Sequence, residues 1–192
     1  MGNSASTSKL PALQTVTNCE TSKFMGTWFV IGVKPTIFEK TSSNAVERYS
    51  LLSDKSYDIN IDFQYNSKEA PTSPLKSLPQ KGWVQGNKEK SGEWKVSPTW
   101  PIKMPYLIIE CDEKYEYCVI GYPSRDYCWI MSRKPKMADA TYEMLTNQLK
   151  EKHHYDLEGL RKVPQIWTSD EREKRGLTAE IPDVMLETRQ VE

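Results

Sequence analysis

The sequence predicts an all-β protein: an eight-stranded up-and-down antiparallel barrel with one C-terminal α-helix packed outside it. Eight short segments are rich in β-branched and aromatic residues, and short turn-like connections join most of them. One of these segments alternates apolar and polar residues strictly, which is typical of a strand with one buried face. A single stretch near the C-terminus has helical spacing instead.

The first three strands are expected between residues 27 and 63. Residues 27–33 are dense in β-branched and aromatic side chains, and Pro35 ends this strand. Residues 45–52 form the second strand. In the third, polar residues separate four apolar residues at a spacing of two: Tyr57, Ile59, Ile61 and Phe63.

A proline- and serine-rich stretch, residues 66–80, predicts a long loop before the second half of the barrel. Two strands then flank the turn Ser91-Gly92, at residues 83–86 and 94–97. Three prolines, Pro98, Pro101 and Pro105, predict another irregular loop. The last three strands are expected at residues 106–111, 117–122 and 127–133.

One amphipathic helix should follow, with Asp139 as its N-cap. Tyr142, Leu145 and Leu149 recur at helical spacing, so this face should pack on the outside of the barrel. Residues 163–167 predict a short closing strand. The chain therefore divides into a disordered N-terminal segment (1–18), a barrel domain (19–168) and a charged, flexible tail (169–192).

The overall charge excludes one class of partner. Lys plus Arg and Asp plus Glu both count 26, giving a formal net charge of zero, and no basic block is present. We therefore expect no nucleic-acid binding. No stretch reaches the roughly 18 apolar residues of a membrane-spanning helix.

The N-terminus suggests another route to membranes. Met1-Gly2-Asn3-Ser4-Ala5-Ser6 fits the pattern for N-myristoylation of Gly2, the alternative being an unmodified polar terminus. One myristoyl chain gives weak, reversible binding, on the order of 10⁴ M⁻¹. Because an apolar signal region is also absent, we expect a cytoplasmic protein, with peripheral contact to the cytosolic face of a membrane if Gly2 is acylated.

Four cysteines leave two interpretations open. Cys19, Cys111, Cys118 and Cys128 would suffice for two disulfides in a secreted protein. Three of them lie in or beside apolar strands, where a small hydrophobic side chain fits, and no secretory signal is seen. We therefore favour free, buried thiols.

Several residues, in their order along the chain, resemble the lipocalin family. Gly26 and Trp28 open the first strand, Asp112 lies in a later turn, and Arg133 ends the run Arg125-Asp126-Tyr127-Cys128-Trp129-Ile130-Met131-Ser132-Arg133. The resemblance is closest to the branch of bacterial outer-membrane lipocalins, apolipoprotein D and plant temperature-induced lipocalins. It implies that Trp28 plugs the closed end of the barrel, with the Arg133 guanidinium lying across the indole.

The same resemblance implies a cavity for a small lipophilic ligand, where composition alone would also allow a filled core. Glu47 either points into the barrel, where it could meet a polar head group, or lies at the rim. The candidate cavity residues are Tyr49, Ile59, Ile61, Phe63, Trp83, Trp94, Val96, Tyr106 and Trp129.

These features predict binding and carriage or scavenging of small lipophilic molecules, with fatty acids or lysophospholipids as the expected ligands. We expect no cofactor, no metal site and no catalytic residues. One alternative is a membrane-tethered module that binds proteins through its loops or tail. The other is an isomerase that depends on Cys118 or Cys128, although the sequence shows no base beside either cysteine.

Overall fold

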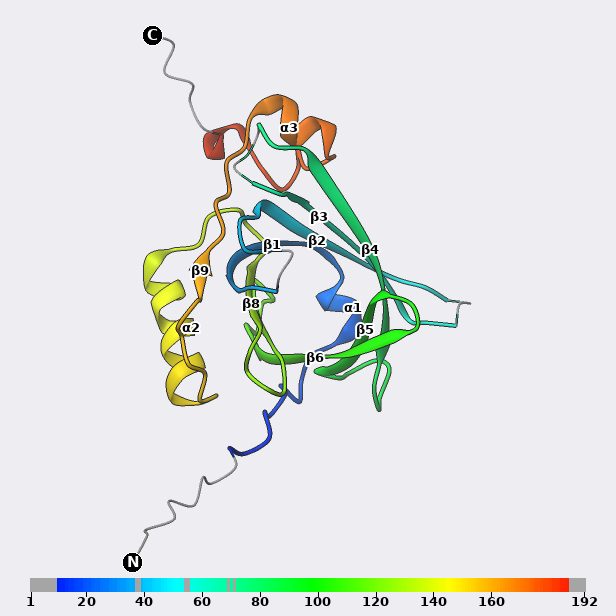
Figure 1. The fold of residues 1–192 in the computed structure, drawn as a ribbon. Coiled ribbons are helices and arrows are strands. Elements are labelled where there is room, and N and C mark those ends of the chain that lie inside the picture. The colour runs from blue at the N-terminus through cyan, green and yellow to red at the C-terminus, as the bar shows by residue number, and fades with distance from the viewer. Residues whose placement is uncertain (1–9, 37–38, 54–55, 69, 71, 187–192) are drawn as a thin grey trace, which may run out of the picture.

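Eight antiparallel strands close into a barrel in the computed structural model, which describes residues 10–36, 39–53, 56–68, 70 and 72–186 (Figure 1). Each strand pairs with the next along the chain, and β1 pairs with both β2 and β8 to close the ring. The predicted eight-stranded barrel is therefore confirmed. Its strands are β1 (Gly26–Lys34), β2 (Ser43–Leu51), β3 (Ile59–Asn66), β4 (Leu75–Val84), β5 (Glu93–Thr99), β6 (Ile102–Cys111), β7 (Tyr117–Gly121) and β8 (Cys128–Ser132).

A short ninth strand, β9 (Arg161–Lys162), lies outside the barrel and pairs with Gly32 and Val33 of β1. The closing strand predicted at residues 163–167 is therefore displaced toward the N-terminus. After β9, the Val163 N–H donates to the Ile31 carbonyl at 2.8 Å, and the Pro164 carbonyl accepts from the Asn44 N–H at 2.8 Å.

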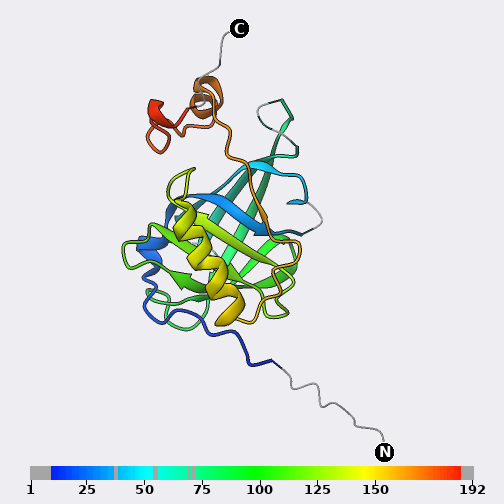
Figure 2. The same cartoon turned by 90° about the vertical axis from the view of Figure 1, so that its left-hand side faces the viewer.

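The main helix, α2 (Asp139–Glu151), packs outside the barrel as predicted (Figure 2). Leu145 and Leu149 are buried in one cluster with Val119 and Ile130, which point outward from β7 and β8. The N-cap is Ala138, so Asp139 is the first helical residue, and its carboxylate accepts from Lys162 Nζ at 2.8 Å. Within the described residues, the other helical segments are α1 (Thr21–Phe24), α3 (Ser169–Lys174) and the 3₁₀ turn η2 (Asp183–Met185).

The long loop predicted at residues 66–80 is wrong in its second half, because β4 begins at Leu75. Pro79 is tolerated in this strand, since a proline fits where one side of the strand needs no backbone donor. Residues 75–80 of β4 pair with β3, whereas pairing with β5 begins only at Lys81.

The irregular loop predicted from the later prolines is also shorter than expected. Pro98 lies within β5, where the register with β6 shifts between Val96 and Thr99. Such bulges accommodate residues that cannot complete the hydrogen-bond ladder. Pro105 lies within β6 opposite Lys95, before pairing with β7 begins at Leu107.

The flexible tail predicted at residues 169–192 is wrong for residues 169–186, which fold back against the outer face of the barrel (Figure 1). Leu177 and Ile181 are fully buried against Phe29, Val46 and Trp167. Residues 187–192 lie outside the described residues.

The N-terminal segment 10–18 has no helix or strand, yet it is held to the barrel. The Val16 N–H donates to the Ile108 carbonyl at 2.9 Å, and Arg125 Nη2 donates to the Pro11 carbonyl at 2.6 Å. Arg125 lies in the β7–β8 connection, so this segment runs up the outside of the barrel to that end. Gly2 lies outside the described residues.

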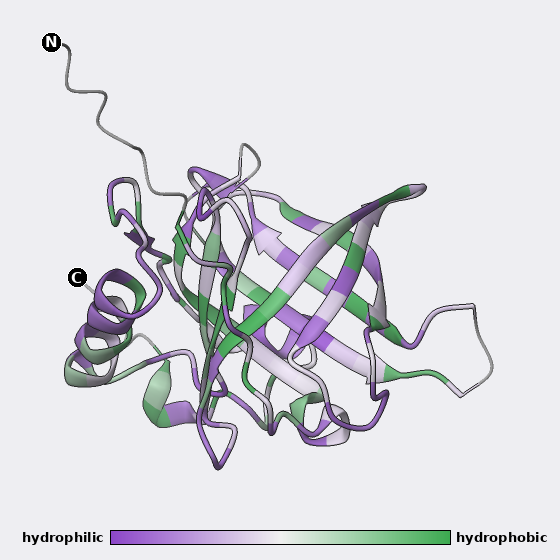
Figure 3. Cartoon of the chain, turned by 90° about the horizontal axis from the view of Figure 1, so that it is seen from below, coloured by the Kyte–Doolittle hydropathy of each residue, from purple (hydrophilic) through white to green (hydrophobic). Residues whose placement is uncertain are grey.

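The strands separate an inner core from outer clusters, and apolar and polar residues alternate along them (Figure 3). The inner core gathers Phe24 and Trp28 with residues from every strand of the barrel. Outside, one apolar cluster lies under α2 and another under the C-terminal segment. At the end of the barrel where β1 begins, Phe24 and Trp28 of this core are fully buried.

Candidate functional site

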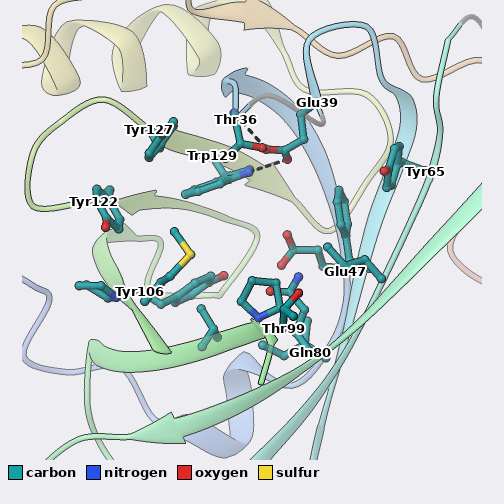
Figure 4. Close-up of a pocket in the computed structure, with 17 residues that line it drawn as sticks. Thr36, Glu39, Glu47, Tyr65, Gln80, Thr99, Tyr106, Tyr122, Tyr127 and Trp129 are labelled. Carbon is teal, nitrogen blue, oxygen red and sulfur yellow. Dashed lines mark hydrogen bonds between the residues drawn. The ribbon is translucent and has the colours of Figure 1, made fainter. Parts of the chain in front are cut away.

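A cavity of about 380 Å³ occupies the other end of the barrel (Figure 4). It opens beside the β1–β2 and β7–β8 connections, which contribute Thr36, Glu39, Tyr122 and Tyr127 to its lining. The walls are mainly apolar and aromatic. They are formed by Glu47 of β2, Ile61, Phe63 and Tyr65 of β3, Leu78 and Gln80 of β4, Val96, Pro98 and Thr99 of β5, Met104, Pro105 and Tyr106 of β6, and Trp129 of β8.

Five of the nine residues predicted for the cavity line it: Ile61, Phe63, Val96, Tyr106 and Trp129. Three others point into the barrel but lie below the cavity. Tyr49, Ile59 and Trp94 belong to the inner core, where the Trp94 ring stacks on Tyr106 with centroids 5.7 Å apart. These three residues form the base on which the cavity rests.

Trp83 does not line the cavity. Its neighbours Gly82 and Val84 are buried toward the interior, so alternation along β4 directs Trp83 to the outer face. There its ring lies 6.2 Å from the Trp100 ring, and Lys103 Nζ lies 3.9 Å from its centroid.

Glu47 points into the barrel, which resolves the alternative that the sequence left open. Its carboxylate accepts a hydrogen bond from the Tyr49 hydroxyl, and that hydroxyl lies 2.6 Å from the Tyr106 hydroxyl. Burial, with a smaller contribution from the Glu39 carboxylate, raises the pKa of Glu47 to about 8. Glu47 therefore gives the cavity a buried carboxyl that is mostly protonated at neutral pH.

A second carboxylate, Glu39, stands at the mouth. Trp129 Nε1 donates to its Oε1 at 2.8 Å, and the Thr36 hydroxyl donates to its Oε2 at 2.7 Å (Figure 4). The Arg161 guanidinium also donates to the Glu39 backbone carbonyl. These bonds fix the β1–β2 connection and the Trp129 indole relative to each other.

Several lining residues were not predicted. Tyr65 continues the period-two pattern of Ile59, Ile61 and Phe63, so extending that pattern by one step would have found it. Leu78 and Gln80 were hidden by the prediction of a loop. Glu39, Tyr122 and Tyr127 come from connections, whose side-chain directions follow from no simple periodicity.

The closed end is built as its motif residues suggest. Trp28 is fully buried, and the Arg133 guanidinium carbon lies 3.8 Å from its ring centroid. Arg133 also donates to the carbonyls of Thr27 at 2.9 Å and Lys23 at 2.9 Å. Gly26 has a φ of 96°, and a Cβ there would lie 3.3 Å from Arg133 Nη1, which explains the glycine.

The turn between β6 and β7, at the same closed end, also agrees with the motif residue Asp112. The Asp112 carboxylate accepts from the backbone N–H of Lys114 at 2.9 Å, between β6 and β7. A family model described as a lipocalin-like domain matches residues 19–165. The chain belongs to the lipocalin family.

In sequence, this lipocalin is similar to plant and bacterial members of the family. It is 27% identical over 173 residues to temperature-induced lipocalin-1 of Arabidopsis thaliana, covering 83% of this chain and 86% of the relative. It is 30% identical over 129 residues to the outer membrane lipoprotein Blc of Citrobacter freundii, covering 65% and 67%.

Solved structures support the fold. Insecticyanin from the tobacco hornworm Manduca sexta superimposes with a TM-score of 0.60 at 15% identity, covering 84% of this chain and 88% of that one. The siderocalin Ex-FABP gives a TM-score of 0.55 at 12% identity, covering 76% and 97%. At these identities the likeness concerns the barrel and not its ligand.

All four cysteines of this lipocalin are free thiols. Cys118 and Cys128 are buried and neither lines the cavity, which disfavours the cysteine-dependent isomerase. Burial also raises the pKa of both thiols, to about 12 for Cys128, so the nucleophilic thiolate is suppressed.

Across the described part of the chain, no three His, Cys, Asp or Glu side chains are grouped so that they could hold a metal ion. No helix among those residues is long and apolar enough to cross a membrane.

Proposed function

We propose that this lipocalin binds and carries or scavenges lipophilic molecules with a single long chain, the class that includes fatty acids and lysophospholipids. The observation that carries the proposal is the cavity of about 380 Å³, which is walled mainly by aliphatic and aromatic side chains and closed at its base by the inner core. Small-molecule sites typically have volumes of about 300–1,000 Å³ and predominantly apolar walls.

The expected affinity follows from burial. Each methylene moved from water into the cavity contributes about 0.8 kcal/mol. Ten methylenes would contribute roughly 8 kcal/mol before the costs of ordering and association are subtracted. Chains of this length or somewhat longer are therefore expected to bind with affinities near the micromolar range.

Replacing Trp129 with alanine is expected to weaken ligand binding about tenfold, equivalent to roughly 1.4 kcal/mol. The indole supplies part of the cavity wall, and its Nε1 holds Glu39 at the mouth. The measurement is displacement of a fluorescent apolar probe by lipids of increasing chain length.

Trp83→Ala is the matched control, because Trp83 lies on the outer face of β4 and should leave affinity unchanged. If Trp83→Ala weakened binding as much as Trp129→Ala, the cavity could not be the binding site. Failure of the wild-type protein to bind any of these lipids would refute the proposed function.

The proposal extends to peripheral contact with the cytosolic face of a membrane. Trp100 is 65% exposed and Ile102 is 60% exposed, and both lie in the β5–β6 connection or directly after it, next to Thr99 of the cavity wall in the sequence. The segment that leads toward Gly2 reaches the same end of the barrel, where Pro11 accepts from Arg125. Free thiols throughout fit a reducing compartment.

A Trp100→Ala/Ile102→Ser variant is expected to bind vesicles about tenfold more weakly than wild type, since both side chains would enter the interfacial layer. Flotation with vesicles of phosphatidylcholine and phosphatidylserine measures this, using N-myristoylated protein. Val184→Ala, an exposed apolar residue on the C-terminal segment, is the control and should behave as wild type. Equal flotation of Gly2→Ala and the myristoylated protein would rule out anchoring through Gly2.

A further inference from the structure

The ionisable carboxyl groups that line the cavity have no basic counterpart in the walls that the structure describes. Two carboxyl groups line it, Glu47 deep inside and Glu39 at the mouth. The other polar lining residues are neutral: threonine, glutamine and tyrosine side chains. Among the described residues, no lysine, arginine or histidine lines the cavity.

This arrangement bears on the head group of a single-chain ligand. A carboxylate head that enters first would meet Glu47, and one that stays at the mouth would meet Glu39. Neither orientation offers a cationic partner. Once Glu47 is ionised, a carboxylate head beside it forms an unpaired couple of like charges, which is strongly unfavourable in an apolar site. A head that carries a positive charge would find an acidic partner in both orientations.

We propose that the cavity selects single-chain lipids with a protonated amine head, such as long-chain amines and sphingoid bases, over fatty-acid carboxylates, and that Glu47 determines this specificity. The inference rests on the proposed function and narrows its ligand class. Glu47 is the stronger candidate of the two carboxyls because Glu39 already accepts hydrogen bonds from Trp129 and Thr36.

The groups around Glu47 predict that ligand affinity depends on pH. The titratable groups that face it are Glu39 from the β1–β2 connection, Tyr49 on its own strand, Tyr106 on β6 and Cys118 on β7. Burial raises the pKa of Tyr106 and of Cys118 well above the ordinary values, so both remain neutral near physiological pH.

Because the pKa of Glu47 is about 8 in the free protein, a bound ammonium group must displace its proton at lower pH. Amine affinity should therefore rise about tenfold per pH unit up to about pH 8, and then level off. A carboxylate ligand should lose affinity as the pH rises through the same value, because it would then face an ionised Glu47. The affinity of an uncharged alcohol should not change over this pH range.

The test compares dodecylamine, dodecanol and dodecanoate, which share one chain length, by displacement of a neutral fluorescent probe from the full-length protein. In the wild type at about pH 8, the affinity for dodecylamine should be at least about tenfold higher than the affinity for dodecanoate. In Glu47→Gln, the preference for amine over alcohol and the pH dependence should both disappear. Retained dodecanol binding would show that the variant keeps its cavity.

Glu39→Gln is the matched control, since it removes the other carboxyl and leaves Glu47 in place. It should keep the pH dependence, with the midpoint moved to lower pH because Glu39 contributes to the raised pKa of Glu47. Dodecanoate binding as tightly as dodecylamine at about pH 8, or an unchanged pH profile in Glu47→Gln, would overturn the inference while leaving lipid binding intact. If none of the three ligands bound, the proposed function itself would fail.

Discussion

Replacing Trp28 with alanine is expected to lower the free energy of unfolding by about 3–5 kcal/mol. The side chain has no exposed surface, and its Nε1 donates to the Phe24 carbonyl at 2.8 Å. Its loss would open a void between Phe24 and the Arg133 guanidinium and remove a cation–π contact of about 2 kcal/mol when desolvated. Urea unfolding followed by far-ultraviolet circular dichroism measures the change without depending on tryptophan fluorescence.

Trp100→Ala is the control, because it also replaces a tryptophan with alanine but at a position where the indole is 65% exposed. Its effect on unfolding should stay within about 0.5 kcal/mol. Should Trp28→Ala unfold at the same urea concentration as wild type, the closed end would not be a principal source of stability.

The closed end could be predicted because Gly26, Trp28, Asp112 and Arg133 occur in the order typical of the lipocalin motifs. Gly26 is required by its positive φ and the nearby Arg133, and Asp112 caps a tight turn with its own carboxylate. Strand β3 was predictable from local spacing, since alternating burial at Ile59, Ile61 and Phe63 leaves a period of two in the sequence. This signal depends on a few neighbouring residues, whereas the contact of Trp28 with Arg133 joins residues far apart in the sequence.

The errors arise where tertiary context decides. Pro79 indicates a loop in the sequence, yet it fits into β4 because that part of the strand pairs on one side only. Trp83 was predicted to line the cavity, which requires it to point inward. The register of β4 directs Gly82 and Val84 inward instead, and no feature of the Trp83 side chain reveals that choice.

The C-terminal segment supplies the second large effect: Leu177→Ala is expected to destabilise the protein by about 2–5 kcal/mol. Leu177 has no exposed surface and belongs to a cluster with Phe29, Val46 and Trp167 on the outer face of β1 and β2. Sequence alone suggested a mobile tail because residues 170–175 are all charged. The measurement is again urea unfolding, with limited proteolysis as a second readout.

Two of those charged residues are buried, which explains how a charged run can dock. Arg175 Nη1 donates to the Asn44 carbonyl at 2.9 Å and Nη2 to the Gln64 carbonyl at 3.2 Å, so one side chain links β2 and β3. Its guanidinium also lies 4.8 Å from the Trp167 ring centroid. Burial lowers the pKa of Arg175 to about 10, which still leaves it charged at neutral pH.

Val184→Ala is the control for the segment, because Val184 is 85% exposed and should change stability by less than about 0.5 kcal/mol. If Leu177→Ala also left the free energy of unfolding unchanged, and protease removed residues 169–186 without affecting the barrel, the segment would be a flexible tail. If Leu177→Ala destabilises the barrel, deleting the segment would also remove the Arg175 link between β2 and β3. Loss of partner binding after such a deletion would then not distinguish a protein-interaction module from a damaged barrel, whereas substitutions at exposed positions of the segment would.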